Sequence, residues 1–242
     1  MRQIRLRRLG YMATLRTSRD FWEEKAVENP AWYISSYGSY HNRDMNSFWQ
    51  SGDAIWTDLK RETGYMPKPT DVIVDIGCGI GRLTRAIARE VGHVHGFDIS
   101  RNMLNEARKL GLPNVTFHET EGNSLRPLPD HSCDLVLAYN VLQHMPSTEV
   151  LREYLHEMAR VTRGMMAFTL SPRDWKTYLL PLLRMRSWMR DGKGPRGIYK
   201  AEWTGIRPRK TTVQALSPLP LQFSVLHGDK WFFLGTCNEA NE

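Results

Sequence analysis

Residues 72–83 read VIVDIGCGIGRL, and this stretch decides the fold. A short apolar run that ends at Asp75 is followed by glycines at alternate positions: Gly77, Gly79 and Gly81. Glycine permits backbone torsions and close approaches that a Cβ atom forbids, so the pattern predicts a tight turn after a buried strand. Apolar residues at helical spacing come next: Leu83, Ile87 and Val91. The stretch therefore predicts a strand, a glycine turn and a helix.

The spacing of the glycines separates two cofactor sites that use such a turn. The dinucleotide fingerprint needs its third glycine three positions after the second, and that position is Arg82. Here the third glycine, Gly81, comes two positions after the second. This D-x-G-x-G-x-G pattern resembles motif I of the class I S-adenosylmethionine-dependent methyltransferases. The resemblance implies S-adenosylmethionine as the cofactor and a Rossmann-like fold.

The composition bounds what else the chain can be. Its 242 residues are 41% hydrophobic, enough for one well-packed domain with additions. No apolar run approaches the roughly 20 residues of a membrane-spanning helix. The three cysteines, Cys78, Cys133 and Cys237, form neither a disulfide framework nor a metal-ligand spacing. We therefore expect a cytoplasmic protein with no metal site.

Strand and helix patterns alternate along the rest of the chain. Further strands are predicted at residues 93–98, 115–119, 133–142 and 164–171, and helices at 101–111 and 147–163. Such alternation predicts a parallel sheet with helices on both faces. The last two apolar runs, 221–226 and 231–237, flank HGDK and predict an antiparallel hairpin. The expected fold is a doubly wound, mostly parallel seven-stranded α/β sheet that ends in this hairpin.

A second acidic residue has a physical role in this arrangement. Asp98 ends the second predicted strand, about 20 residues after the glycine turn, where a carboxylate can accept hydrogen bonds from both ribose hydroxyls. The alternative is a loop aspartate that caps the following helix. In the methyltransferase family the residues just after this acid line the adenine, which implies Ile99 and Met103. Both would also be ordinary core residues.

The family also places an acidic residue after the third strand, usually in a Gly-Asp pair, to accept from the adenine amino group. This sequence has Gly122 followed by Asn123, whose amide oxygen can also accept that bond. The cofactor-binding residues implied by the resemblance are Asp75, Gly77, Cys78, Gly79, Gly81, Asp98, Ile99, Met103, Gly122, Asn123, Ser124 and Asn140.

The residues after the fourth strand indicate a branch of the family. The run NVLQHMP, residues 140–146, resembles the small-molecule branch related to quinone-biosynthesis methyltransferases. The Asn/Asp-Pro-Pro-Tyr tetrapeptide of the amino-group methylases of nucleic acids and proteins is absent here. His144 is the candidate general base, with a helix-start histidine of no chemical role as the alternative. Tyr139 and Asn140 are the other catalytic candidates, as positioning groups.

The net charge of +7 is unevenly distributed. Residues 1–20 hold six arginines and one aspartate, and residues 172–210 hold eleven lysines and arginines against three acids. Two interpretations of this asymmetry are open. The charges are solvated surface charge, or they attract an anionic substrate or a nucleic acid. For residues 1–20 a flexible tail is favoured over a transit peptide or an anion-binding arm.

The domain organisation follows from these segments. We expect a single methyltransferase domain over residues 21–242, with a helical cap at about 21–65 and a helical substrate lid at about 172–207. Residues 29–40, NPAWYISSYGSY, are rich in aromatic side chains and predict an irregular flap or simple packing of an N-terminal helix.

The expected activity is transfer of a methyl group to an O, N or C nucleophile of a small metabolite. Anionic and aromatic metabolites are among the candidates. The alternatives are an RNA-modifying methyltransferase and an enzyme that binds S-adenosylmethionine on the same fold without methylating.

Overall fold

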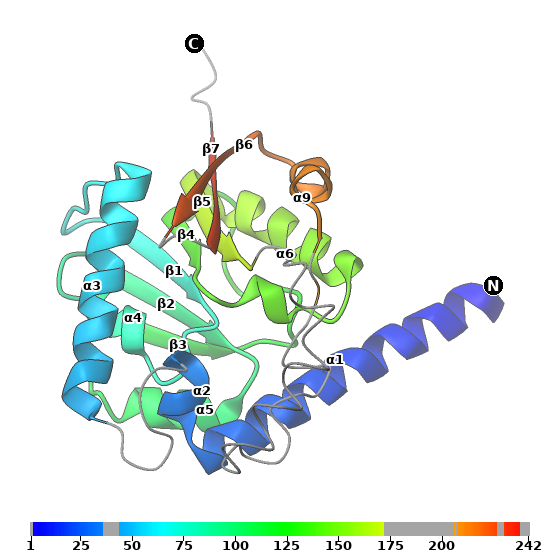
Figure 1. Cartoon of the computed structure of the whole chain (residues 1–242), viewed down its shortest axis with the longest axis horizontal. Helices are drawn as coiled ribbons and strands as arrows, with labels where there is room; N and C mark the ends of the chain where they lie inside the picture. Colours follow the sequence, from blue (N-terminus) through cyan, green and yellow to red (C-terminus); the bar gives the residue numbers. More distant parts are fainter. Residues whose placement is uncertain (1, 36–43, 172–205, 207, 227–229, 238–242) are drawn as a thin grey trace, which may run out of the picture.

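The fold is built on one seven-stranded sheet (Figure 1). The computed structural model describes residues 2–35, 44–171, 206, 208–226 and 230–237, with the backbone alone for residues 2–14. The strands are β1 (Val72–Ile76), β2 (His93–Asp98), β3 (Val115–Glu119), β4 (Cys133–Ala138), β5 (Thr162–Leu170), β6 (Leu221–Leu226) and β7 (Lys230–Thr236). Their order in the sheet is β3-β2-β1-β4-β5-β7-β6.

The pairing of the strands confirms the predicted topology. Strands β1 to β5 are parallel, and β7 runs antiparallel to both β5 and β6. The order reverses between β1 and β4, because β2 and β3 lie on one side of β1 and the later strands on the other. In open sheets of this type, ligands bind at the carboxyl ends of the strands beside such a reversal. The fold therefore directs attention to the ends of β1, β2 and β4.

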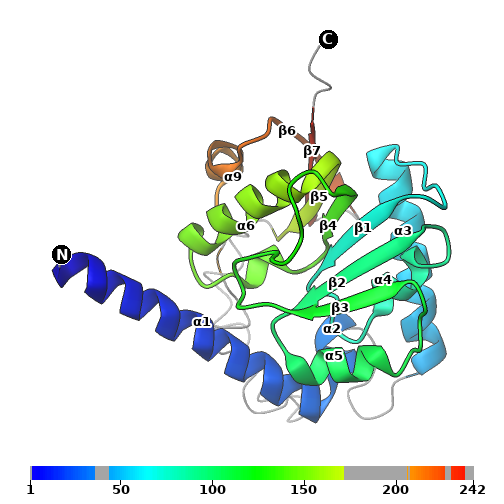
Figure 2. The same cartoon turned by 180° about the vertical axis from the view of Figure 1, so that it is seen from behind.

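Two groups of helices cover the two faces of the sheet (Figures 1 and 2). Helices α3 (Met45–Thr63) and α4 (Arg82–Ile87) pack on one face, where the core includes Trp56, Ile73 and Leu135. Helices α6 (Thr148–Val161) and α9 (Lys210–Leu216) pack on the other, against Val74 and Val136. Neighbouring strand residues thus face opposite layers, as expected for a sheet buried on both faces. Each large side chain buried there contributes roughly 1.5–3 kcal/mol.

Side chains at the helix starts explain where several helices begin. Ser147 accepts a hydrogen bond from the backbone N–H of Val150 at the start of α6. Asp44 does the same for Asn46 and Ser47 at the start of α3. Ser100 caps α5 (Arg101–Arg108) through the N–H of Met103. Such caps are worth about 1 kcal/mol each and fix where the preceding loops turn into helices.

The N-terminal region differs from its prediction. Where the sequence favoured a flexible tail over residues 1–20, the structure has α1 (Arg2–Glu28), whose first half extends away from the body (Figure 1). Helix α2 (Pro30–Ser35) covers part of residues 29–40 and matches the alternative of a packed N-terminal helix rather than that of an irregular flap. Its start follows capping rules, because Asn29 Oδ1 accepts from the N–H of Trp32 and Pro30 stands at the first helical position. The aromatic density of this segment obscured that signal.

Two other predictions have different outcomes. The helix after the glycine turn is shorter than its apolar spacing suggested: α4 ends at Ile87, and the chain turns before Val91, which is nevertheless buried. The predicted lid at 172–207 lies outside the described residues except for Ile206, whose N–H donates to the Met145 carbonyl oxygen at 3.0 Å. The lid therefore stays a prediction.

Candidate functional site

The carboxyl ends of β1 and β2 meet through the Asp98 carboxylate. Its Oδ2 accepts from the backbone N–H of Gly79 at 2.8 Å, and its Oδ1 accepts from that of Ser100 at 2.9 Å. The side chain is buried, with 8% of the residue exposed. Asp98 therefore links the glycine turn to the loop that follows β2. Each carboxylate oxygen can accept a second hydrogen bond, so these contacts do not exhaust the group.

Burial raises the pKa of both acidic residues at this edge of the sheet. It raises that of Asp98 to about 6, opposed by hydrogen bonds from the backbone N–H groups of Ser100 and Gly79. Burial raises the pKa of Asp75 to about 7, opposed by a hydrogen bond from the Thr84 hydroxyl and reinforced by the charge of Asp98. Two acidic groups whose charged forms are disfavoured are typical of a site completed by a ligand.

The glycine turn has the conformation that the sequence predicted. Gly77, Gly79 and Gly81 all have positive φ angles. At Gly79 the neighbouring space is also closed to a side chain, because a Cβ atom would lie 2.6 Å from Cδ1 of Ile34 in α2. Arg82, at the position of the missing fingerprint glycine, is buried against α3 and donates to the Ser51 hydroxyl at 3.3 Å.

The hydrogen bonds of the turn indicate which ligands suit it. The N–H groups of Gly77 and Cys78 both donate to the Phe97 carbonyl oxygen, and that of Gly81 donates to Cys78. The N–H of Gly79 is bound to Asp98. A pyrophosphate cradle needs such donors pointing at the ligand. Since these four are bound within the protein, the turn suits a nucleoside cofactor without phosphate better than a dinucleotide.

The loop after β3 also reaches this edge of the sheet. Gly122 has a φ angle of 97°, and a Cβ atom there would lie 2.9 Å from Cδ1 of Ile99 and 3.4 Å from Cδ2 of Leu15. Ile99 is half-buried and lies beside Gly122, and its contact with the adenine stays a prediction. Met103, in contrast, is buried among residues of the N-terminal helices and matches the alternative of an ordinary core residue.

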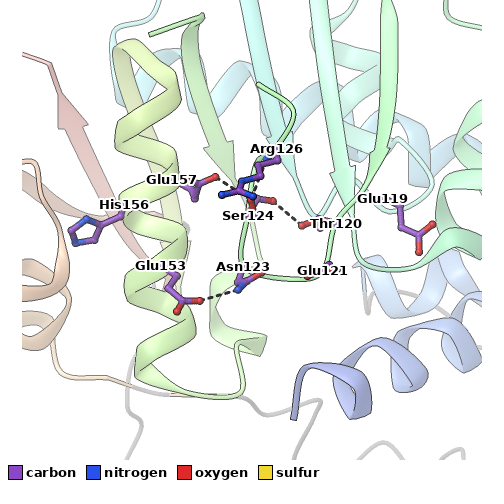
Figure 3. Close-up of a pocket in the computed structure, with 9 residues that line it drawn as sticks. All are labelled: Glu119, Thr120, Glu121, Asn123, Ser124, Arg126, Glu153, His156 and Glu157. Carbon is purple, nitrogen blue, oxygen red and sulfur yellow. Dashed lines mark hydrogen bonds between the residues drawn. The ribbon is translucent and has the colours of Figure 1, made fainter. Parts of the chain in front are cut away.

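The side chains of Asn123 and Ser124 contact α6. The Asn123 amide donates to Glu153 at 3.0 Å, and the Ser124 hydroxyl donates to Glu157 at 3.3 Å. An open pocket of about 660 Å³ lies here (Figure 3). Its lining residues are Glu119, Thr120, Glu121, Asn123, Ser124, Arg126, Glu153, His156 and Glu157. The glycine turn and Asp98 are not among them.

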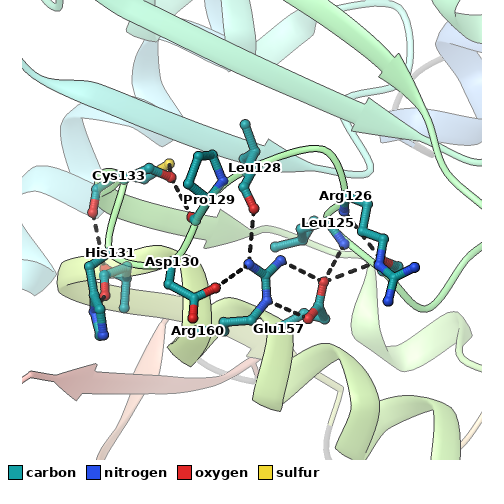
Figure 4. A network of polar contacts seen from close by, with 12 residues as sticks. Leu125, Arg126, Leu128, Pro129, Asp130, His131, Cys133, Glu157 and Arg160 are labelled. Carbon is teal, nitrogen blue, oxygen red and sulfur yellow. Dashed lines mark hydrogen bonds and ion pairs between the residues drawn. The ribbon is translucent and has the colours of Figure 1, made fainter.

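A polar network anchors this loop to α6 (Figure 4). Glu157 accepts from the backbone N–H of Leu125 at 2.8 Å and binds Arg160. Arg160 also donates to the Leu128 carbonyl oxygen at 2.9 Å and pairs with Asp130 at 2.7 Å. The hydrogen bond from Arg160 is the main cause that holds the pKa of Glu157 below its usual value. The network therefore fixes the loop that carries Gly122.

Two predicted cofactor residues lie beneath the turn. Asp75 is buried and accepts from the Thr84 hydroxyl at 2.6 Å, which ties β1 to α4. Cys78 is buried, and its sulfur would lie 3.1 Å from a Cβ atom on Gly96 in β2. Its side chain therefore packs against β2, and only its backbone belongs to the turn's inner surface.

The three catalytic candidates follow β4 but have different surroundings. Asn140 has a positive φ angle of 61°, and its N–H donates to the Thr169 hydroxyl at 2.8 Å. The Tyr139 hydroxyl accepts from Lys230 Nζ at 3.1 Å. His144 lies in a short 3₁₀ helix, η1 (Leu142–His144). Its ring packs edge-on against that of Trp22, with the two ring centroids 5.3 Å apart.

Several residues of α1 reach the site, and sequence reasoning missed them. Glu23 binds Ser100 and the start of α5, Arg19 donates to the Thr120 carbonyl oxygen at 3.1 Å, and Trp22 contacts His144. Each contact joins residues roughly 80 to 120 positions apart, and no local pattern in residues 19–23 indicates such a partner. Lys230 was missed for the same reason.

Comparison with known proteins agrees with this geometry. Residues 73–164 match the family model described as "Methyltransferase domain". Over these residues the chain is similar to methyltransferase domains. A "Probable methyltransferase ltbC" of Aspergillus luteorubrus is 35% identical over 109 residues, which are 40% of this chain and 38% of that protein. A "Ubiquinone biosynthesis O-methyltransferase" of Hydrogenovibrio crunogenus is 28% identical over 115 residues, 46% of each chain.

The fold comparison covers more of the chain. The crystal structure of magnesium protoporphyrin IX methyltransferase from Synechocystis PCC 6803 has a TM-score of 0.59 at 18% identity, and the match covers 90% of this chain and 97% of that one. The likeness confirms the Rossmann-like fold. The chain spans less than half the length of the two curated relatives above. Among the described helices, none is long and apolar enough to cross a membrane.

Proposed function

We propose that the protein binds S-adenosylmethionine at the carboxyl ends of β1, β2 and β3 and transfers its methyl group to a small-molecule nucleophile. The observation that carries the proposal is the buried Asp98 carboxylate, held between the N–H groups of Gly79 and Ser100. A carboxylate at this position has the acceptor capacity for the two hydroxyls of a ribose. The bonded donors of the glycine turn further favour a cofactor without phosphate.

The other cofactor residues have assigned roles in the proposal. Ile99 and Gly122, which nearly touch, offer an apolar edge for the adenine. The Asn123 amide, bound to Glu153, is the candidate partner of the adenine amino group through its oxygen. The turn from Gly77 to Gly81, with Asp75 and Cys78 beneath it, supports the methionine part, and Met103 and Ser124 hold the surrounding loops.

When bound, the cofactor supplies an activated sulfonium methyl group. The chain's own residues then align the nucleophile and exclude water, because holding two reactants in line removes much of the entropic cost of the reaction. Asn140 and Tyr139, at the end of β4, are the proposed positioning groups. His144 is the proposed base where the acceptor must lose a proton. Trp22 packs edge-on beside its ring.

Names of the matched relatives support a small acceptor. They include ubiquinone biosynthesis O-methyltransferases, a phosphoethanolamine N-methyltransferase of Caenorhabditis elegans and a 2-methyl-6-phytyl-1,4-hydroquinone methyltransferase of Synechocystis. We propose an acceptor of comparable size with a hydroxyl, amine or activated carbon. A reducing compartment such as the cytoplasm suits the free cysteines, Cys78, Cys133 and Cys237.

Calorimetry tests the cofactor directly. The full-length protein is titrated with S-adenosylmethionine, S-adenosylhomocysteine and NAD⁺ in parallel. Binding of the first two without binding of NAD⁺ is expected. A panel of catechols, hydroquinones and phosphoethanolamine is then screened for release of S-adenosylhomocysteine. The proposed function would be overturned if NAD⁺ bound tightly, or if none of the three ligands bound.

A further inference from the structure

Glu23 of α1 forms three hydrogen bonds with the start of α5. Its carboxylate accepts from the N–H of Arg101 at 2.7 Å, from that of Asn102 at 3.1 Å and from the Ser100 hydroxyl at 3.0 Å. The Ser100 hydroxyl in turn accepts from the N–H of Met103. The first N–H groups of α5 are therefore satisfied by a carboxylate from a helix 77 to 79 residues away. A negative charge at this end of a helix is also favourable electrostatically.

The same contacts continue to the proposed ribose-binding carboxylate. Ser100 binds Glu23 with its hydroxyl and Asp98 with its backbone N–H. Asp98 then binds Gly79 in the glycine turn. Glu23, Ser100, Asp98 and Gly79 thus form one continuous chain of hydrogen bonds from α1 to the turn after β1. Glu23 therefore contacts Asp98 through Ser100, which supplies one of the backbone N–H donors that orient the Asp98 carboxylate.

Other contacts hold this half of α1 over the same loops. Arg19 donates to the carbonyl oxygen of Thr120, whose N–H donates to the carbonyl oxygen of Asp98. Leu15 is buried beside Gly122. Figures 1 and 2 both show α1 running beside α5. Residues 15–28 are therefore attached to the loops after both β2 and β3.

We propose that Glu23 is a positioning residue for the cofactor site, and that docking of residues 15–28 of α1 and binding of the cofactor strengthen each other. The inference rests on the proposed function. By linkage, whatever α1 adds to cofactor affinity the cofactor must add to the attachment of α1. Glu23 touches no cofactor atom in this account and acts through Ser100 and Asp98.

Affinity for S-adenosylhomocysteine, measured by calorimetry, tests the positioning role. Glu23→Gln keeps the size of the side chain but loses the charge and one acceptor oxygen, and should weaken binding roughly tenfold, within the usual range of such couplings. Asp20→Asn is the matched control, because Asp20 is an exposed acid on the same helix, and its affinity should equal that of the wild type. Thermal unfolding of each variant checks that it folds.

A double-mutant cycle distinguishes positioning from a purely structural role. If Glu23 acts through Asp98, adding Glu23→Gln to Asp98→Asn should weaken binding by much less than tenfold. Hydrogen exchange of the wild type supplies a readout without mutations, and S-adenosylhomocysteine should slow exchange in residues 15–28 and at the start of α5. If the wild-type protein binds S-adenosylhomocysteine, three results would each overturn the inference. They are unchanged affinity in Glu23→Gln, additive effects in the double-mutant cycle, and unchanged hydrogen exchange on binding. Absence of wild-type binding would overturn the proposed function and this inference together.

Discussion

Asp98 accepts a hydrogen bond from the backbone N–H of Gly79 at 2.8 Å, across the gap between the ends of β2 and β1. The two residues are 19 positions apart: Asp98 ends β2, and Gly79 lies in the glycine turn after β1. This contact closes one side of the proposed cofactor site before any ligand is bound. It also sets the orientation in which the carboxylate offers its remaining acceptor positions.

Replacing Asp98 should weaken cofactor binding strongly. Asp98→Ala removes the acceptor of the proposed ribose bonds and leaves the N–H of Gly79 without its partner. Hydrogen bonds to a charged group are worth about 1.5–3 kcal/mol, so we expect S-adenosylhomocysteine affinity to fall by roughly 10- to 100-fold. Calorimetry gives the value, with Glu106→Gln, an exposed acid on α5, as the control. Unchanged affinity in Asp98→Ala would remove the ribose assignment.

Cofactor binding should depend on pH through Asp98. Burial raises the pKa of this residue to about 6, so its carboxylate becomes protonated well above the range of an ordinary aspartate. A protonated Asp98 loses acceptor strength for the ribose hydroxyls. Affinity for S-adenosylhomocysteine should therefore fall as the pH is lowered from 8 through about 6. Flat affinity over this range would mean that the cofactor does not use this carboxylate.

Asp75 should lower the stability of the protein at neutral pH without ligand. Its pKa is about 7 in the fold, against an ordinary value of 3.8, so the folded state holds the proton more tightly than the unfolded chain. By holding its proton, Asp75 therefore contributes stability that is fully present below about pH 4 and is lost as the pH rises towards 7. Asp75→Asn mimics the neutral form and can still accept from Thr84. It should raise the free energy of unfolding at pH 8 by roughly 1–4 kcal/mol, as measured by urea titration.

The same variant tests whether Asp75 is a cofactor residue. If its charge supports the methionine part of the cofactor, Asp75→Asn should lose affinity while it gains stability. Such a trade-off between stability and function is common at sites that hold unfavourable charges. A more stable variant with wild-type affinity would show that Asp75 only joins β1 to α4.

The sequence predicted the parts of this protein that depend on local patterns. The strand at Val72–Ile76, the glycine turn and Asp98 follow from local patterns, because a buried strand appears as a short apolar run and the turn after it needs glycine where φ is positive. All seven strands lie where apolar periodicity indicated, within a few residues at their ends.

The contacts of α1 could not be predicted in the same way. Glu23 meets Ser100 only because α1 crosses α5, and no spacing within residues 15–28 indicates that crossing. The arginine-rich composition of residues 1–20 instead favoured a tail, since charge weighs heavily when packing partners are unknown. For Met103 the family position indicates the adenine, while tertiary packing with Ala26, Ala31 and Phe48 favours the core-residue alternative.

Removing Arg160 should loosen the loop after β3. Arg160→Met keeps the aliphatic length but breaks the bonds to Glu157, Asp130 and the Leu128 carbonyl oxygen. Because the guanidinium is partly exposed, we expect a loss of about 1–2 kcal/mol in the free energy of unfolding. The depressed pKa of Glu157 means that its stabilising contribution exists above pH 4.5 and is lost as the pH falls further. The difference between variant and wild type, followed by urea unfolding, should therefore shrink in acid, and a constant difference would contradict this account.

His144 should matter for turnover and not for cofactor binding. It lies after β4 with its ring edge-on to Trp22, whereas Asp98 is bound by the backbone N–H groups of Gly79 and Ser100. If it accepts the proton of a hydroxyl acceptor, His144→Ala should lower turnover about 100-fold or more, the usual value of a positioned base. Affinity for S-adenosylhomocysteine should stay within about twofold.

Trp22→Phe, which keeps an aromatic ring beside the imidazole, is the matched control and should retain most of the rate. The assay uses the acceptor identified by the panel, and the wild-type rate should rise as the imidazole deprotonates. Wild-type rate and pH profile in His144→Ala would leave alignment by Tyr139 and Asn140 as the main contribution of this edge of the sheet.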